Sequence, residues 1–471
     1  MISLPKSFQL VARLALVVLG LLATASTARA VPAFARKYGT SCQTCHIVFP
    51  KLNAFGEAFR LPGYRMPGET EEMVKQPPVS LGAPAYKQLW PQAVWPGEIS
   101  SSVPLAVNVK LADMNTSSLN EEHEVSTVKH DLQFPQEVNV FGAGTLGEHV
   151  SYLSEMTFGE NADGSISVEL EHAHMGFDSP FGPEDLFHFR IGKLAPNVVS
   201  GFQEMWISTD LGIDSLFGYN PIGLHGGTGL AEDVSPAPIS IPAIARGIEG
   251  YGIIKHRALW VAGLANGIGP SDASGRFDGN NAKDVYARFD YKVGGMGLDG
   301  DTGGQAIVSD KNWRDNSLRL GVFTYRGDGS HIDFPLTTDA GLSRNVQDVH
   351  FLRTGVYANL FFQDLNVFGA YLHGTDSLQV FNPATAALLN AIEPDYHAWF
   401  TQADYVIYPW LQAGYRYETL TPADRSEPIL RTGVANVSAL VRANVKAMVE
   451  YQRDLREGDN HSLNALLRFA F

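Results

Sequence analysis

The sequence predicts a mainly β protein, in which a small α-helical N-terminal domain precedes an antiparallel transmembrane β-barrel of about sixteen strands. Apolar and polar residues alternate along many short segments of the 471-residue chain. No segment after the first 30 residues approaches the ~20 consecutive apolar residues that a membrane-spanning helix needs. The last strand also ends on the aromatic Phe471. A chain that crosses a bilayer without helices must do so as a closed barrel, so these observations together indicate a barrel.

Residues 1–30 predict a secretory signal peptide. Lys6 and Arg13 flank the start of an apolar run, and small residues on both sides of Arg29 offer a cleavage site. An exported barrel is expected in a bacterial outer membrane, with outer-membrane lipid around it. Three of the 35 basic residues lie in this signal, which leaves 32 against 50 acidic residues in the mature chain. That acidity argues against nucleic acid as a partner and suits either cations or simply well-hydrated loops.

Residues 31–75 predict a small domain built around Cys42-Gln43-Thr44-Cys45-His46, which contains both cysteines of the chain. Two thiols at this spacing can reach both vinyl groups of a haem while the adjacent histidine binds the iron. A redox-active disulfide would need a thioredoxin-like context, and a structural zinc would need a fourth ligand. One covalent haem c is therefore expected, with Cys42, Cys45 and His46 as its binding residues and His46 as the proximal iron ligand.

The second axial ligand of that haem is left open by the sequence. Met66 lies within the same small domain, and a thioether ligand there would raise the redox potential. The rivals are His172 and His174, which are expected to share one strand face with Leu170 and to point into the lumen. Ordinary polar lining of the lumen is the alternative interpretation of the two histidines. A further candidate is His123, whose glutamate neighbours could gather a divalent cation or form a solvated loop.

A helix is expected directly after the haem motif. Starting from His46, the apolar residues Val48, Leu52, Phe55 and Phe59 recur at intervals of three and four. Such a stripe could pack against a haem plane or could be an ordinary buried helix face. Next, residues 76–98 contain several prolines and predict a linker without a sustained helix or central strand.

Residues 99–471 predict the barrel. From Ala443 to Gln452, for example, small or apolar residues alternate with mostly polar ones, which gives one face of each kind. Two stretches, 200–245 and 294–312, resist assignment to strands and are expected to be long loops, one of which could fold inward. The expected strands start near residues 101, 130, 149, 166, 185, 246, 258, 283, 316, 351, 365, 397, 411, 430, 443 and 462.

The haem region resembles the fused monohaem cytochrome-porin family of bacterial outer membranes, whose best-known members are iron oxidases. The resemblance covers about residues 31–65. It implies a haem domain in or at the mouth of a barrel of about sixteen strands, and Cys42, Cys45 and His46 carry over onto the haem positions. The chain departs from the family at Lys37-Tyr38 and at Glu57, which leaves the electron donor open. The matching residues are Pro32-Ala33-Phe34-Ala35-Arg36, Gly39, Cys42 to His46, Phe49-Pro50, Leu52, Phe55-Gly56 and Phe59.

The expected function is that of an outer-membrane cytochrome-porin, which carries electrons across the membrane through one haem. A periplasmic soluble cytochrome or similar carrier is the expected partner on one side. Extracellular Fe(II) is the candidate donor on the other, which makes Fe(II) oxidase a candidate activity. The alternative is a solute-conducting porin whose haem domain is a plug or redox gate. An open, charged lumen would favour the porin, whereas a filled lumen would favour the conduit.

Overall fold

The computed structural model describes most of the chain after residue 32. The described residues are 33–69, 73, 79–80, 82–83, 85–94, 98–99, 104–119, 125–160, 164–181, 185–199, 205–213, 217, 241–267, 282–304, 311–329, 334–337, 343–381, 388–393, 395–422, 429–456 and 460–471.

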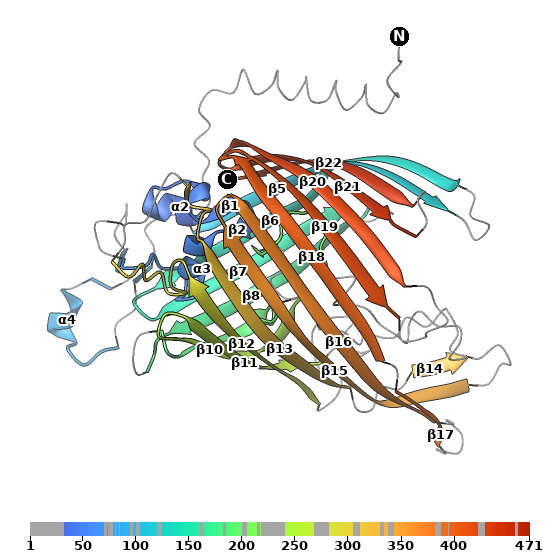
Figure 1. Cartoon of the computed structure of the whole chain (residues 1–471). Coiled ribbons are helices and arrows are strands. Elements are labelled where there is room, and N and C mark those ends of the chain that lie inside the picture. Colours follow the sequence, from blue (N-terminus) through green and yellow to red (C-terminus); the bar gives the residue numbers. More distant parts are fainter. Residues whose placement is uncertain are drawn as a thin grey trace, which may run out of the picture.

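Sixteen long antiparallel strands close into a barrel, which confirms the predicted fold class (Figure 1). Two short strands, β14 (Phe334–Thr337) and β17 (Leu388–Ile392), extend hairpins of this barrel. The barrel closes where β22 pairs with β5, and the backbone of Phe471 exchanges two hydrogen bonds with Val107. The sixteen strands are β5 (Leu105–Leu119), β6 (Val125–Leu146), β7 (Val150–Glu160), β8 (Ile166–Asp178), β9 (His188–Leu194), β10 (Ala245–Ile254), β11 (Ala258–Asn266), β12 (Lys283–Gly294), β13 (Ser317–Gly329), β15 (Ser343–Phe362), β16 (Leu365–Phe381), β18 (Asp395–Tyr408), β19 (Leu411–Thr421), β20 (Leu430–Arg442), β21 (Val445–Asp454) and β22 (His461–Ala470).

The two faces of the wall are reversed relative to a water-soluble protein. On β12, the apolar Phe289 and Val293 are about half exposed, whereas Asp284, Arg288 and Asp290 are at most 3% exposed. The alternation of period two therefore turns apolar side chains outward and charged ones into the lumen. An outward apolar face around a closed barrel is suited to lipid. The chain is an outer-membrane barrel and lies in a bacterial outer membrane.

One end of the barrel carries five very short connections, at 147–149, 255–257, 363–364, 409–410 and 443–444. Short turns mark the periplasmic end of bacterial barrels. The N-terminal helices lie at this end, opposite the end from which β14 and β17 project (Figure 1). We call residues 33–69 the mouth segment. None of the described helices is long and apolar enough to span a bilayer.

The mouth segment consists of short elements, and the predicted helix starting at His46 is wrong. Residues His46–Val48 (β1) and Lys51–Leu52 (β2) instead form a hairpin. Pro50 explains the difference, because proline lacks the N–H that a helix needs and restricts the residue before it. The helix starts only at α3 (Ala54–Arg60), where the Asn53 side chain accepts a hydrogen bond from Gly56 N at 2.8 Å. Two further elements precede this hairpin, α2 (Ala33–Tyr38) and the 3-10 turn η1 (Cys42–Thr44).

Part of the predicted loop 200–245 does fold inward. We call residues 195–199, 205–213 and 217 the inward segment. Four of its apolar side chains, those of Val198, Trp206, Ile213 and Phe217, are at most 5% exposed and pack in one cluster with inward-facing aromatic residues of the wall. The lumen therefore contains an apolar core made partly by this segment.

The predicted linker is only partly described, as β3 (Val79–Ser80), α4 (Tyr86–Leu89) and β4 (Glu98–Ile99). The division of the chain at residues 75 and 98 stays a prediction. His123 and its glutamate neighbours lie outside the described residues.

Candidate functional site

The two cysteines lie on one tight turn. Ser41 caps η1 by accepting a hydrogen bond from Gln43 N at 3.3 Å, and Cys45 N donates to Cys42 O at 3.2 Å. In a 3-10 turn, residues three apart lie above one another, so Cys42 and Cys45 are presented on the same side. Both are free thiols. Burial raises the pKa of Cys42, and burial together with Cys42 raises the pKa of Cys45 to about 12. These are not the acidic thiols of a redox-active Cys-x-x-Cys.

The orientation of the His46 ring is fixed by a hydrogen bond from its Nδ1. Its Nδ1 lies 2.9 Å from Pro50 O, and burial lowers its pKa, so the imidazole is neutral and donates from Nδ1. The lone pair then resides on Nε2. A histidine that binds a metal through one nitrogen commonly donates its other N–H to a backbone carbonyl in this way.

Helix α3 packs directly on the cysteine turn. A Cβ at Gly56 would lie 2.1 Å from Cys45 O, so only glycine fits this approach. Asn53 completes the contact, since its side chain donates to Thr44 O at 3.0 Å. Phe59 of the predicted haem-facing stripe is buried, and it meets Phe34 edge-on at 5.1 Å between ring centroids.

The mouth segment is fixed to the barrel at several charged and polar contacts. Lys51 is 1% exposed and reaches Asp404 of β18, with an Nζ–Oδ2 distance of 2.6 Å. The same Asp404 accepts a 2.6 Å hydrogen bond from Ser208 of the inward segment. At the rim, Arg65 pairs with Asp178 at 2.9 Å, and the Gln43 side chain donates to Pro409 O at 2.7 Å. The cysteine turn is therefore held in the periplasmic mouth.

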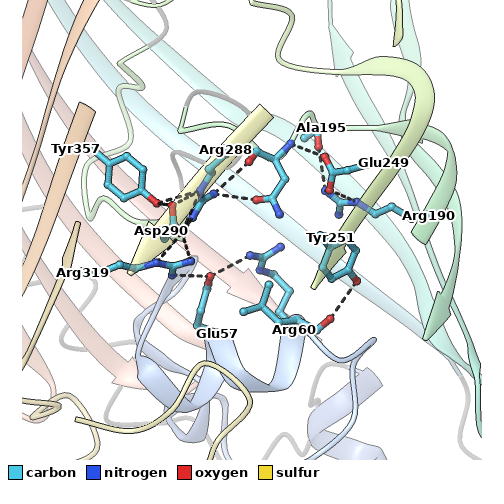
Figure 2. A network of polar contacts seen from close by, with 12 residues as sticks. Glu57, Arg60, Arg190, Ala195, Glu249, Tyr251, Arg288, Asp290, Arg319 and Tyr357 are labelled. Carbon is cyan, nitrogen blue, oxygen red and sulfur yellow. Dashed lines mark hydrogen bonds and ion pairs between the residues drawn. The ribbon is translucent and has the colours of Figure 1, made fainter. Parts of the chain in front are cut away.

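Glu57 joins a larger network in the lumen, shown in Figure 2. Its carboxylate lies 3.1 Å from both Arg60 and Arg319, and Arg319 also bonds Asp290 at 2.5 Å. Burial disfavours the charge on Glu57, but the neighbouring guanidinium groups outweigh it and lower its pKa to about 2. The network continues through Arg288 to the backbone of Asn197 at 3.2 Å, so it links the mouth segment to the inward segment.

His172 and His174 both face the lumen, with exposed fractions of 8% and 6%, as the alternation predicted. The prediction that Leu170 shares their face is wrong, since Leu170 is 44% exposed on the outer face. The register explains this, because Glu155 pairs with His172 whereas Met156 pairs with Leu170, which leaves Glu171 as the extra residue of a β-bulge. Met66 lies in the mouth segment, and its role as distal ligand stays a prediction.

Sequence reasoning missed the residues that position the cysteine turn. Lys51 and Asp404 are 353 residues apart in the chain, and nothing in the local pattern marks them as partners. Arg319, likewise, has no local sequence feature that marks it as a partner of Glu57. The signal that could have been used is Glu57, the one acidic residue of helix α3.

No protein-family model matches the chain, and no curated protein matches it. Several solved structures of outer-membrane barrels are similar to the chain in fold. OmpF of Salmonella typhi, solved in a complex with daunomycin, is 10% identical, with 78% of this chain and 97% of that chain covered at a TM-score of 0.50. The anion-selective porin of Comamonas acidovorans is also 10% identical, with 78% and 99% covered at 0.46. OmpT of Vibrio cholerae is 11% identical, with 79% and 98% covered at 0.43.

The fold and its OmpF likeness define the class of protein, which is an outer-membrane β-barrel of the porin type. At this level of identity the likeness concerns the fold alone.

Proposed function

We propose that the chain is a porin-type barrel whose mouth segment carries one covalent haem c and which passes electrons across the outer membrane. The observation that carries the proposal is the turn at Cys42, Cys45 and His46, held in the periplasmic mouth by Lys51 and Arg65. Two free thiols one turn apart and an imidazole with its Nδ1 already bonded are the donor set that a c-type haem requires.

In this proposal each residue has a separate task. Cys42 and Cys45 would hold the haem through their thiols, and His46 would offer Nε2 to its iron, while Pro50 O fixes the orientation of the imidazole ring. The haem, when bound, supplies a one-electron carrier. Gly56 lets α3 pack directly against the turn. The partners would be a soluble periplasmic cytochrome at the mouth and, from outside, a donor such as Fe(II).

The packing of the lumen favours electron transfer over solute flow. Trp206 of the inward segment lies 5.2 Å from Phe368 and 5.6 Å from Tyr357 of the wall, measured between ring centroids. Its ring is also covered by Arg319, whose guanidinium carbon lies 5.0 Å from the ring centroid. Aromatic rings and paired guanidinium groups thus occupy part of the lumen. The fold class, in contrast, supports the second candidate, a solute porin with a haem-bearing plug.

Covalent haem is tested with the mature protein produced in a host that attaches c-type haem. The expected result is a denaturation-resistant haem signal that is lost in Cys42→Ala/Cys45→Ala. His46→Ala should retain the tether but change the iron spectrum. Folded wild-type protein without covalent haem would overturn the proposal.

Two measurements on the haem-loaded protein then separate the two candidates. In sealed liposomes, a membrane-impermeant reductant outside should reduce a trapped acceptor cytochrome, and the same vesicles should show little uptake of small sugars. Rapid sugar uptake without electron transfer would instead favour the gated porin and reject the conduit. Fe(II) serves as one of the reductants, so failure with Fe(II) alone rejects only iron as donor.

A further inference from the structure

A cluster of two carboxylates and a histidine lies on the lumen wall, away from the cysteine turn. Glu155 of β7 and His172 of β8 are direct cross-strand partners, with Oε2 and Nδ1 2.9 Å apart. Glu171 comes next to His172 in the sequence and would point to the opposite face of a regular strand. The β-bulge brings it to the lumen side instead, and ligand atoms of all three residues lie within 4.8 Å of one another.

His172 is buried and the two glutamates are partly buried, and the hydrogen bonding of the cluster is incomplete. The side chains of Glu155 and His172 are 12% and 10% exposed. Among the described residues, His172 Nε2 has no hydrogen-bond partner, and neither has Nδ1 of His174, two residues further along the same face. A buried imidazole nitrogen without a partner costs free energy, and two adjacent buried carboxylates repel each other. A bound cation would remove both penalties.

We propose that Glu155, Glu171 and His172 bind a divalent first-row transition-metal ion on the lumen wall, with His174 beside it as a further donor. The donor set decides the class of ion. Two carboxylates and an imidazole suit Fe(II), Mn(II), Co(II) or Zn(II) better than Ca²⁺ or Mg²⁺, which prefer oxygen ligands only. A β-bulge next to a functional site is also a recurrent device for redirecting a side chain.

The site does not depend on haem, because its ligands come from β7 and β8 and not from the mouth segment. It would serve as an entry point for a metal donor only if the proposed electron transfer also holds. The two ideas can therefore fail separately. Binding of a redox-inactive ion tests the site alone.

Mn(II) is the probe of choice, since its free form gives a strong paramagnetic resonance signal and thiolates bind it poorly. The full-length, haem-loaded protein in detergent is titrated with Mn(II), and bound ion is read as lost signal. We expect the wild type to bind one Mn(II) ion per chain at this site. In Glu171→Gln and in His172→Ala, this binding should be lost or its affinity should fall at least about tenfold. Glu171→Gln preserves side-chain shape, and heat-modifiable electrophoretic mobility checks that both barrels are folded.

A matched control exists on the outer face of the same barrel. His373, Asp395 and His397 also bring ligand atoms within 4.8 Å of one another, but they are 37–50% exposed. The double substitution His373→Ala/His397→Ala should leave Mn(II) binding at the lumen site unchanged. The proposal is overturned if Mn(II) binding is the same in wild type, Glu171→Gln and His172→Ala, or if the outer-face variant alone removes it.

Discussion

Two segments pack against the inner side of the barrel wall, and they are held there by different forces. The inward segment is apolar, and Trp206, Ile213 and Phe217 are buried among aromatic residues of the wall. The mouth segment also has apolar contacts, at Ile47 and Leu61, but its charged side chains pair with the wall, through Lys51 to Asp404 and through Glu57 to Arg319. Apolar packing is non-directional and scales with buried area, whereas paired charges require a specific geometry. The inward segment therefore supports the stability of the barrel, and the mouth segment depends on a few contacts for its position.

The largest effect is expected for Trp206→Ala. Removing this side chain leaves a cavity against Phe368 and Tyr357, and it should lower the free energy of unfolding of the barrel by about 3–5 kcal/mol. Urea unfolding in detergent micelles, followed by electrophoretic mobility, measures this value. Trp90→Ala is the control, because Trp90 is 57% exposed and should change stability by less than about 0.5 kcal/mol. Equal effects of the two substitutions would contradict the distinction between the segments.

Lys51→Met should release the mouth segment and leave the barrel folded. The substitution keeps the length of the side chain but leaves Asp404 buried without its cation, at a cost of about 3 kcal/mol to docking. Hydrogen exchange of the amides in residues 33–69 should accelerate, while that of the wall strands should not.

A second substitution tests whether the lost charge pair is the cause. Asp404→Asn in the Lys51→Met background removes the unpaired charge and should recover part of the protection. If Lys51→Met instead lowers the free energy of unfolding of the barrel as much as Trp206→Ala does, the mouth segment is part of the core and the comparison fails.

The same difference explains how much could be predicted from the sequence. All sixteen strands were expected, because a wall between lipid and lumen imposes a period of two at every position. Twelve of their starts were placed within two residues, among them those of β8, β11, β12, β16, β19 and β20. The larger errors are at ends such as the start of β15, at Ser343 instead of 351, where a strand continues in a hairpin with β14 beyond the regular wall.

The candidate site was predictable only where its signal is local. Cys42, Cys45 and His46 are neighbours in sequence, and so they were found without the fold. The bulge at Glu171 breaks the period of two without any sequence mark, which is why Leu170 was placed on the wrong face. Pro50, in contrast, was a readable reason against a helix at His46, and the apolar spacing was wrongly given more weight.

The smallest effect is expected for Glu57→Gln, since Arg319 keeps its bond to Asp290 and the amide keeps the shape of the carboxylate. Docking of the mouth segment should weaken by about 1–2 kcal/mol at neutral pH. The pKa of Glu57 is lowered to about 2, below its ordinary value, so its contribution is fully present above about pH 4.5 and is lost as the pH falls toward 2. The difference in amide protection between wild type and Glu57→Gln should therefore shrink over this pH range, and a difference that grows on acidification would show that Glu57 does not hold the segment as an anion.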